Sequence, residues 1–554
     1  MTYRHFRNPD RKDWRRWAPR LLLGSFFFLA IWGYGTLQRP SFWDPAYYLA
    51  PAASLVVDGD LDLRNDMLSM ETSPELLLRA LCRTTATGRL QSDFPVGPGL
   101  FWAPVYFIGG LLDGSYLAEQ PGQRWTSGPL LAIFLTALTV AAMVLLGLAR
   151  WASKLGAGPP TSSLLAGGLF LGTPVGLYAV HLYTMAHALS ALAVLGLLAA
   201  SLRFAERPGP LAGLTMGAAF GAVVLLRWQD AVMGPIPLAA AMLAWKKEAA
   251  PRRGLGTLLA LAAAAAMAAV QFSAWWQERG GIPWSPQGEG FMRWRHPQVL
   301  DLLFSGYSGV LPWAPMLLLG GLGLLLPWRC RLPQTWRWAF LLIFTAEIYL
   351  SAAAADWWGG LAYGPRRLSS LVPLAAVGLV NAALGLRKGV PCRLAVVAVL
   401  LAAAWGLVNM HLFLGGVRDL SVLVTGHPSA SAAAVRDRFV QDHGTALEVL
   451  GSWLERWGPL PAEFAPGALP SAARAGLLGA AALGALVLAA WVFERVPRRL
   501  LEAGTAVAAL VLALAVQPLI LGESAGRAPE PGTWAGACAA AARGPSRCFF
   551  FNDT

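Results

Sequence analysis

Long runs of apolar residues without charges constrain this chain more than any other feature. A helix that crosses a membrane needs roughly 20 such residues, and the sequence offers about thirteen candidate spans. They cover residues 21–37, 129–149, 162–180, 185–203, 211–228, 231–245, 255–275, 307–327, 337–355, 367–386, 394–415, 471–492 and 501–521. Only 14% of the 554 residues are charged, whereas soluble proteins carry about 25%. The sequence therefore predicts an all-α polytopic membrane protein.

Lysines and arginines indicate the orientation of these spans, because cytoplasmic loops carry an excess of both. Residues 1–20 hold seven of them, so a basic, cytoplasmic N-terminus is expected. The first apolar run lacks an obvious small-residue cleavage site and is expected to stay as an anchor. Alternation of the spans then places nearly every later basic cluster on the same, inner side. The net charge of +13 reflects this topology, and no nucleic-acid partner is expected.

One apolar segment, residues 94–114 ("FPVGPGLFWAPVYFIGGLLDG"), does not fit that alternation. Counting it as a span would move every later basic cluster to the outer side. Pro95, Pro98 and Pro104 also disfavour a regular helix. We expect a re-entrant or interfacial segment on the outer face, packed against protein or lining a cavity.

The predicted organisation follows from these assignments. Residues 1–20 are cytoplasmic, and residues 21–415 form the transmembrane core, which includes a first outer loop at 38–128 and a shorter outer loop at 276–306. An outer segment, 416–470, precedes two further transmembrane helices within 471–521, and an outer tail follows at 522–554. Cys538 and Cys548 share this tail, where a disulfide and two free thiols both remain open.

Asp44 lies a few residues beyond the first span, in "FWDPAYYLA", next to Tyr47 and Tyr48. One interpretation is an exposed loop acid near the interfacial belt of aromatic residues. The other is a general base in a cavity under the first outer loop, where a carboxylate accepts the proton of an attacking hydroxyl.

More acids follow in "DGDLDLRND", at Asp58, Asp60, Asp62 and Asp66. Their alternation resembles the start of an EF-hand calcium loop. Ser69, however, stands where such a loop needs a bidentate glutamate. We expect these acids to shape or solvate the loop.

A second cluster of candidates follows the span at 337–355. Asp356, Trp357, Trp358, Arg366 and Arg367 lie together in "DWWGGLAYGPRRLSSL". Two adjacent arginines on the outer side depart from the rule that basic residues concentrate in cytoplasmic loops. Arginine also forms bidentate contacts with phosphate. The cluster favours a site for an anionic lipid headgroup. The alternative is an Asp356–Arg pair that closes a structural turn.

Three further outer turns carry candidate side chains. Arg227, in "RWQDAV", is a functional candidate at the membrane rim, or it pairs with Asp230 to stabilise a helical hairpin. His181 and His187 are six residues apart and do not share a helical face, so hydrogen bonds to a sugar or a neighbouring helix are expected rather than zinc. His296 lies on the 276–306 loop with Arg293 and Arg295.

Four stretches resemble the GT-C superfamily of membrane glycosyltransferases. They are "WDPAYYLAPAASLVVDGDLDL", "FPVGPGLFWAPVYF", "FSGYSGVLPWAPMLLL" and "DWWGGLAYGPRRLSSLVPL". The resemblance extends over roughly residues 20–415 and is to bacterial proteins similar to protein O-mannosyltransferases and aminoarabinose transferases. It implies a GT-C-like bundle with outer loops in the bacterial inner membrane, with the C-terminus in the periplasm. The implied reaction transfers a sugar from a polyprenyl-phosphate-linked donor to a lipid, glycan or protein acceptor.

The resemblance also implies roles for individual residues. Asp44 would be the base or the acid that positions a divalent metal, and Arg366 and Arg367 would bind the donor phosphate with help from Arg227. The remaining candidates for the substrate cavity are Tyr47, Tyr48, His181, His187, His296, Asp356, Trp357 and Trp358.

Two departures from the family pattern limit this assignment. Pro45 follows Asp44, where protein O-mannosyltransferases carry a second consecutive acid. A second acid must therefore come from elsewhere, with Asp58, Asp60 and Asp356 as candidates, and metal dependence stays open. The oligosaccharyltransferase signature WWDxG is absent from the sequence, so asparagine glycosylation is not expected.

Two other functions remain as alternatives: a lipid or polysaccharide transporter or flippase, and a catalytically inactive GT-C-like scaffold. A transporter is expected to place polar residues near the middle of the membrane. Here the conspicuous charges lie at helix ends, with Glu347 as the main exception. This distribution favours chemistry at the membrane surface.

Overall fold

The structure is a computed structural model that describes residues 43–70, 84–114, 116, 124–245, 250–360, 362–386 and 390–414. The predicted N-terminal segment and first span, and everything after residue 414, lie outside the described residues, including Cys538 and Cys548. The described part is helical, and its β-pairing is limited to two isolated bridges, Thr84 with Leu90 and Met292 with Ala354.

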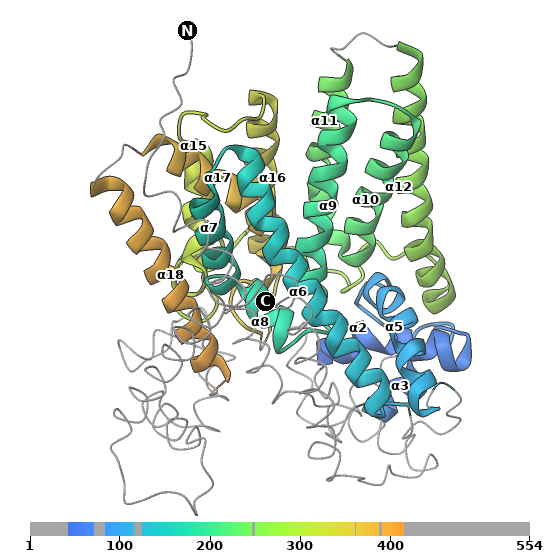
Figure 1. The fold of residues 1–554 in the computed structure, drawn as a ribbon. Helices are drawn as coiled ribbons and strands as arrows, with labels where there is room; N and C mark the ends of the chain where they lie inside the picture. Colours follow the sequence, from blue (N-terminus) through green and yellow to red (C-terminus); the bar gives the residue numbers. More distant parts are fainter. Residues whose placement is uncertain are drawn as a thin grey trace, which may run out of the picture.

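The helices follow one another without an intervening sheet (Figure 1). Their bounds are α2 (Trp43–Ala53), α3 (Arg64–Met70), α5 (Gly97–Asp113), α6 (Ser127–Leu155), α7 (Pro159–Leu171), α8 (Pro174–Val180), α9 (Ala186–Glu206), α10 (Pro210–Leu226), α11 (Pro235–Trp245), α12 (Ala250–Arg279), α13 (Val299–Phe304), α14 (Val310–Trp313), α15 (Pro315–Leu325), α16 (Gln334–Ala353), α17 (Val372–Gly385) and α18 (Val390–Leu414). A π-helix, η1 (Ser54–Asp58), and two 3-10 helices, η4 (Trp228–Met233) and η5 (Arg366–Leu371), complete the described elements.

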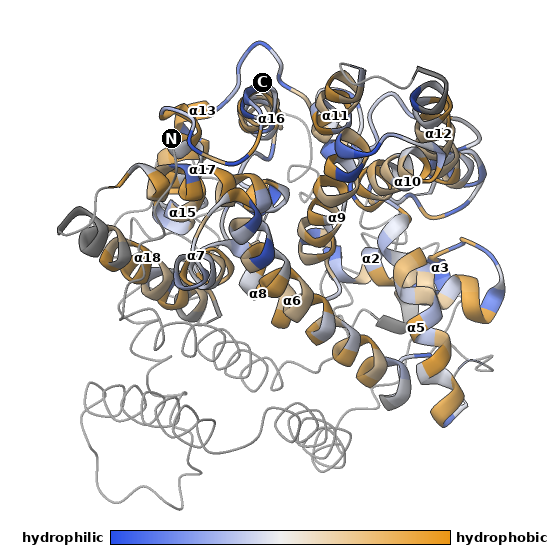
Figure 2. Ribbon diagram, turned by 45° about the horizontal axis from the view of Figure 1, so that its top comes forward, coloured by the Kyte–Doolittle hydropathy of each residue, from blue (hydrophilic) through white to orange (hydrophobic). Residues whose placement is uncertain are grey.

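Four stretches in the described part are long and apolar enough to cross a membrane: 128–155, 186–206, 253–279 and 366–385. The pair α7 and α8 would make a fifth span, although the two helices are bent by 73°. Figure 2 shows hydrophobic residues on helix surfaces that face away from the bundle, as on α5, α12 and α18. These features indicate a membrane protein. The predicted count of about thirteen spans is not confirmed, because α10, α11 and α15 are shorter than a full crossing.

Two predicted spans are interrupted rather than continuous. Between α7 and α8, Thr173 has an extended backbone (φ −137°), as expected for a residue before proline. Between α14 and α15, Ala314 leaves the helical conformation just before Pro315. In both places a proline then starts the next helix, where its missing N–H is not needed.

The proline-rich segment 94–114 differs from the sequence-based prediction, because its backbone is regular. Residues 97–113 form α5, with Pro98 in the first turn and Pro104 inside the helix. Gly109 allows α5 to approach α6 closely, since a Cβ there would lie 2.6 Å from the carbonyl oxygen of Gly128. The expectation of an irregular backbone was wrong because Pro98 occupies a position that proline favours.

The ends of the long helices form two distinct groups. At one end, Arg331 N donates to the carbonyl of Leu155 over 3.0 Å, and Arg329 N donates to Asn381 Oδ1 over 2.7 Å. At the opposite end, the carboxylate of Glu278 at the end of α12 accepts a hydrogen bond from Ser92 N over 2.8 Å. Figure 1 shows α2, α3 and α5 at this second end, and the end of α11 and the start of α12 at the first. Arg329 and Arg331, from one of the basic clusters predicted to be inside, therefore lie at the end of the helices opposite to the first loop.

The acidic stretch after α2 is organised by one buried arginine, Arg124. Asp58 receives two hydrogen bonds from its guanidinium group, over 2.6 and 2.7 Å, and Asp66 receives one over 2.7 Å. Arg124 is 2% exposed and Asp66 is fully buried. Burial raises the pKa of Asp66 to about 7, while the charge of Arg124 acts in the opposite direction. The cluster fixes the first loop to the start of α6. Asp66 depends on the nearby positive charge of Arg124 to stay ionised.

Replacing Arg124 with Gln is expected to lower the free energy of unfolding by about 3–5 kcal/mol, because Asp66 loses its buried counter-ion. The measurement is the unfolding midpoint of the purified protein in mixed detergent micelles. Adding Asp66→Asn should restore part of the loss. Arg150→Gln, at an exposed position of α6, is the control and should change stability by less than about 0.5 kcal/mol. Equal midpoints for Arg124→Gln and Arg150→Gln would contradict this role.

Candidate functional site

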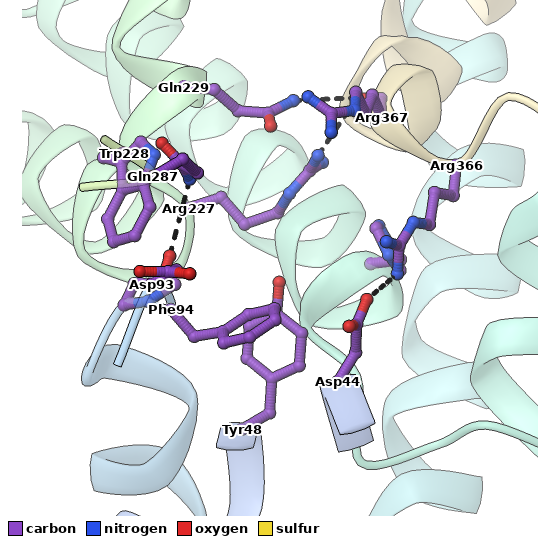
Figure 3. Close-up of a pocket in the computed structure, with 12 residues that line it drawn as sticks. Asp44, Tyr48, Asp93, Phe94, Arg227, Trp228, Gln229, Gln287, Arg366 and Arg367 are labelled. Atoms are coloured by element: carbon purple, nitrogen blue, oxygen red, sulfur yellow. Dashed lines mark hydrogen bonds and ion pairs between the residues drawn. The ribbon is translucent and has the colours of Figure 1, made fainter. Parts of the chain in front are cut away.

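A pocket opens where the first loop meets the ends of the long helices (Figure 3). Its walls come from α2, the loop before α5, the first turn of α9, the α10–α11 connection, the loop after α12, and η5. The lining residues are Asp44, Tyr48, Asp93, Phe94, Pro95, His187, Arg227, Trp228, Gln229, Gln287, Arg366 and Arg367. Three arginines and two carboxylates therefore face one pocket, although they come from distant parts of the sequence.

Asp44 and Arg366 form an ion pair across this pocket (Figure 3). Asp44 lies in the first turn of α2, where a negative charge interacts favourably with the helix dipole. Arg366 begins η5, and its side chain lies close to Gly359, which has φ +77° and where a Cβ would be 3.0 Å from the guanidinium Nε. Both charged side chains are largely buried, at 17% and 15% exposure. The pair therefore joins the first loop to the helix that starts at η5.

Arg367 is held by contacts on both its side chain and its backbone. Its guanidinium lies 2.6 Å from Asp356 Oδ1 and 5.4 Å above the centre of the Phe291 ring. Its carbonyl oxygen accepts hydrogen bonds from Arg227 and from Gln229, each over 3.1 Å. This network fixes the backbone at the start of η5.

Gln229 also connects the pocket to the charged residue inside α16. Its side-chain amide donates to Glu347 Oε1 over 2.9 Å, and Glu347 is fully buried. The acid that sequence reasoning found in the middle of a predicted span therefore bonds a pocket-lining residue from a neighbouring element.

Arg227 lies between α10 and η4 and is 4% exposed. Its Nη1 is 3.7 Å from Asp230 Oδ1, so the predicted Arg227–Asp230 pair is present at the edge of ion-pair distance. Asp230 also accepts a hydrogen bond from the hydroxyl of Ser190. Arg227 Nη1 makes no hydrogen bond within the described residues. Nη1 itself is buried, and Arg227 contributes its positive charge to the lining of the pocket.

Tyr48 and His187 add neutral polar groups to the pocket. Tyr48 packs edge-on against Phe94, with ring centres 5.0 Å apart, and burial raises its pKa to about 12. Its phenol therefore stays protonated at neutral pH. His187 is 3% exposed, its ring centre lies 4.4 Å from that of Tyr178, and neither ring nitrogen has a hydrogen-bond partner in the described part of the chain.

Six of the predicted cavity residues do not line this pocket: Tyr47, His181, His296, Asp356, Trp357 and Trp358. Tyr47 is buried on another face of α2 and stacks on Phe94, with ring centres 5.2 Å apart. Trp357 is buried and packs edge-on against Trp358. His181 is buried, whereas His296 is exposed on a separate turn.

The second carboxylate of the pocket is Asp93, which sequence reasoning missed. Asp58, Asp60 and Asp356 bond Arg124, Ser54 and Arg367 instead. The position of Asp93 depends on the docking of its loop onto α12, where Arg279 Nη2 reaches the carboxylate at 3.5 Å. No local pattern around Asp93 signals that contact. Trp228, Gln229 and Gln287 were missed for the same reason.

The described residues contain no group of three or more His, Cys, Asp and Glu side chains that could hold a metal ion. Asp44 and Asp93 are the carboxylates that line the pocket, and a third protein ligand is missing there in the described part. The divalent metal that the sequence resemblance suggested stays a prediction.

No known protein-family profile matches this chain, and no curated protein sequence matches it. Among solved structures, it is similar to the archaeal oligosaccharyltransferase AglB from Archaeoglobus fulgidus, in complex with an inhibitory peptide and a dolichol-phosphate. The TM-score is 0.35 and the identity 12%, over 82% of this chain and 62% of AglB. The chain thus spans less than two thirds of the length of AglB. A likeness of this size does not establish a common fold, and the proposed function does not depend on it.

We expect a stabilising interaction within each of the two ion pairs, Asp44–Arg366 and Asp356–Arg367. The double variant Asp44→Asn/Arg366→Gln should be more stable than the sum of its single variants predicts, by about 0.5–3 kcal/mol. Asp356→Asn/Arg367→Gln should show the same coupling. The crossed combinations, Asp44→Asn with Arg367→Gln and Asp356→Asn with Arg366→Gln, are matched controls and should show a smaller coupling, because neither joins two groups in direct contact. Unfolding midpoints in detergent measure all four cycles, and equal coupling in the crossed pairs would contradict this geometry.

Proposed function

We propose that this chain is a membrane glycosyltransferase. It transfers a sugar from a polyprenyl-phosphate-linked donor to an acceptor at the outer face of the bacterial inner membrane. The observation that carries the proposal is the convergence of Asp44 with Arg227, Arg366 and Arg367 on one open pocket at the helix ends. The resemblance of "WDPAYYLA" and "GPRRLSSL" to GT-C transferases supports the same assignment.

The arginines suit the leaving group of this reaction. Transfer breaks the bond between the anomeric carbon of the sugar and a phosphate oxygen, so negative charge develops on the lipid phosphate. Preorganised cations stabilise such charge, and guanidinium groups bind phosphate through paired hydrogen bonds. Arg227, Arg366 and Arg367 bring three such cations to the lining of the pocket.

Asp44 suits the proton transfer on the acceptor side. When the acceptor hydroxyl attacks the anomeric carbon, its proton needs a base within hydrogen-bond reach. Asp44 is paired with Arg366 before substrate binds. A donor phosphate that engages Arg366 would draw the guanidinium away and leave the carboxylate to receive the proton. The ion pair thereby favours binding of the donor before the acceptor hydroxyl is activated.

The helix that follows the pocket loop carries an apolar surface that suits the lipid part of the donor. Phe107, Ile108 and Leu112 are exposed along α5, and α5 packs against α2, which carries Asp44. Apolar side chains exposed at this place are suited to a prenyl chain or to the surrounding bilayer.

Asp44→Asn is expected to lower the turnover of sugar transfer by about 10²–10⁴-fold, the usual contribution of a general base. The assay measures transfer from a panel of polyprenyl-phosphate sugars by protein reconstituted in vesicles. Asp62→Asn, in the same loop but outside the pocket, is the matched control and should keep wild-type turnover.

Wild-type turnover in Asp44→Asn would show that the proposed base is wrong. If the wild-type protein bound polyprenyl phosphate but transferred no sugar from any donor of the panel, the result would favour the transporter or scaffold alternatives.

A further inference from the structure

An exposed turn outside the pocket carries the sequence "RWRH", residues 293–296. Backbone hydrogen bonds tie it to the end of α16. Arg293 N donates to the carbonyl of Ala353 over 2.6 Å, and Gln298 N donates to that of Ala352 over 2.8 Å. On the other side of the turn, Ala355 N donates to the carbonyl of Phe291 over 2.7 Å. The turn is therefore held in a defined position at the helix end.

The turn continues an exposed stripe on α16. Trp338, Leu342, Thr345 and Tyr349 are exposed at spacings of four, three and four residues, which place them on one face of the helix. Trp294 stacks on Tyr349, with ring centres 6.2 Å apart, and its carbonyl accepts a hydrogen bond from the Tyr349 hydroxyl over 2.6 Å. The stripe ends in a pair of aromatic rings, of which Trp294 is 51% exposed.

Basic side chains lie directly beyond these rings. Arg293, Arg295 and His296 are exposed. Within the described residues neither arginine forms an ion pair, not even with Glu289 or Asp301, the nearest acids along the chain. The turn lies at the same end of the helices as the pocket, because Phe291 packs under Arg367. Arginines at this predicted outer end run against the inside bias of basic residues, so topology does not explain their presence.

We propose that this basic turn and the α16 stripe together bind an anionic phospholipid of the outer leaflet. The two guanidinium groups match the lipid phosphate, and tryptophan and tyrosine favour the headgroup level of a bilayer. The stripe of α16 offers an apolar surface to the acyl chains. None of these residues lines the pocket, so the site is separate from the proposed donor site and does not depend on the proposed function.

The experiment is lipid titration of the full-length, detergent-purified protein, followed by native mass spectrometry. Phosphatidylglycerol should bind wild type more tightly than phosphatidylcholine does. Arg293→Gln/Arg295→Gln should weaken phosphatidylglycerol binding about thirtyfold, which corresponds to roughly 1 kcal/mol for each arginine. Phosphatidylcholine binding should stay unchanged. The matched control, Arg203→Gln/Arg207→Gln, removes two exposed arginines at the other end of α9 and should retain the wild-type affinity.

A second variant, Arg293→Lys/Arg295→Lys, distinguishes loss of charge from loss of folding. It retains both positive charges and should therefore keep most of the preference for phosphatidylglycerol. The proposal is overturned if both lipids bind wild type equally, or if the Gln variant binds phosphatidylglycerol as wild type does. It is also overturned if the control variant loses the same affinity, or if millimolar inorganic phosphate displaces the lipid completely, which would indicate a site for free phosphate.

Discussion

The ion pair between Asp44 and Arg366 is the interaction on which the arrangement of the pocket depends. It joins the first turn of α2 to the start of η5, two elements separated by more than three hundred residues. Largely buried charges at a helix end are tolerated because each has a partner. The same contact brings the carboxylate and the guanidinium to one pocket, so the fold and the proposed chemistry share it.

Three further contacts hold the first loop over the helix ends. Arg124 fixes Asp58 and Asp66 at the start of α6, and Glu278 fixes Ser92 at the end of α12. The loop therefore approaches the pocket from two sides, carrying Asp44 and Tyr48 from one and Asp93 from the other. In the proposed reaction, the donor phosphate would replace Asp44 as the partner of Arg366. The three contacts that hold the first loop would stay in place.

Sequence reasoning predicted the helical class and the placement of several charged residues because those properties are local. Apolar runs mark helices, and the position of Asp44 relative to a predicted span placed it near a helix end. Arg366 and Arg367 were candidates because they depart from the positive-inside rule, and Arg227 was a candidate because it is an ionisable residue at the predicted membrane rim. Asp93 and Gln229 were not foreseeable, since their roles arise when distant segments pack. The regular helix α5 was missed because three prolines suggested irregular backbone, although Pro98 sits where a helix tolerates it.

The central claim is that the Asp44–Arg366 pair opens to receive a lipid phosphate. A cryo-electron microscopy structure of the full chain in a nanodisc with polyprenyl phosphate tests it most directly. The account predicts phosphate density within hydrogen-bond distance of Arg366 and of Arg227 or Arg367, with the carboxylate of Asp44 no longer bonded to Arg366. Phosphate bound elsewhere, with the Asp44–Arg366 pair intact, would contradict it.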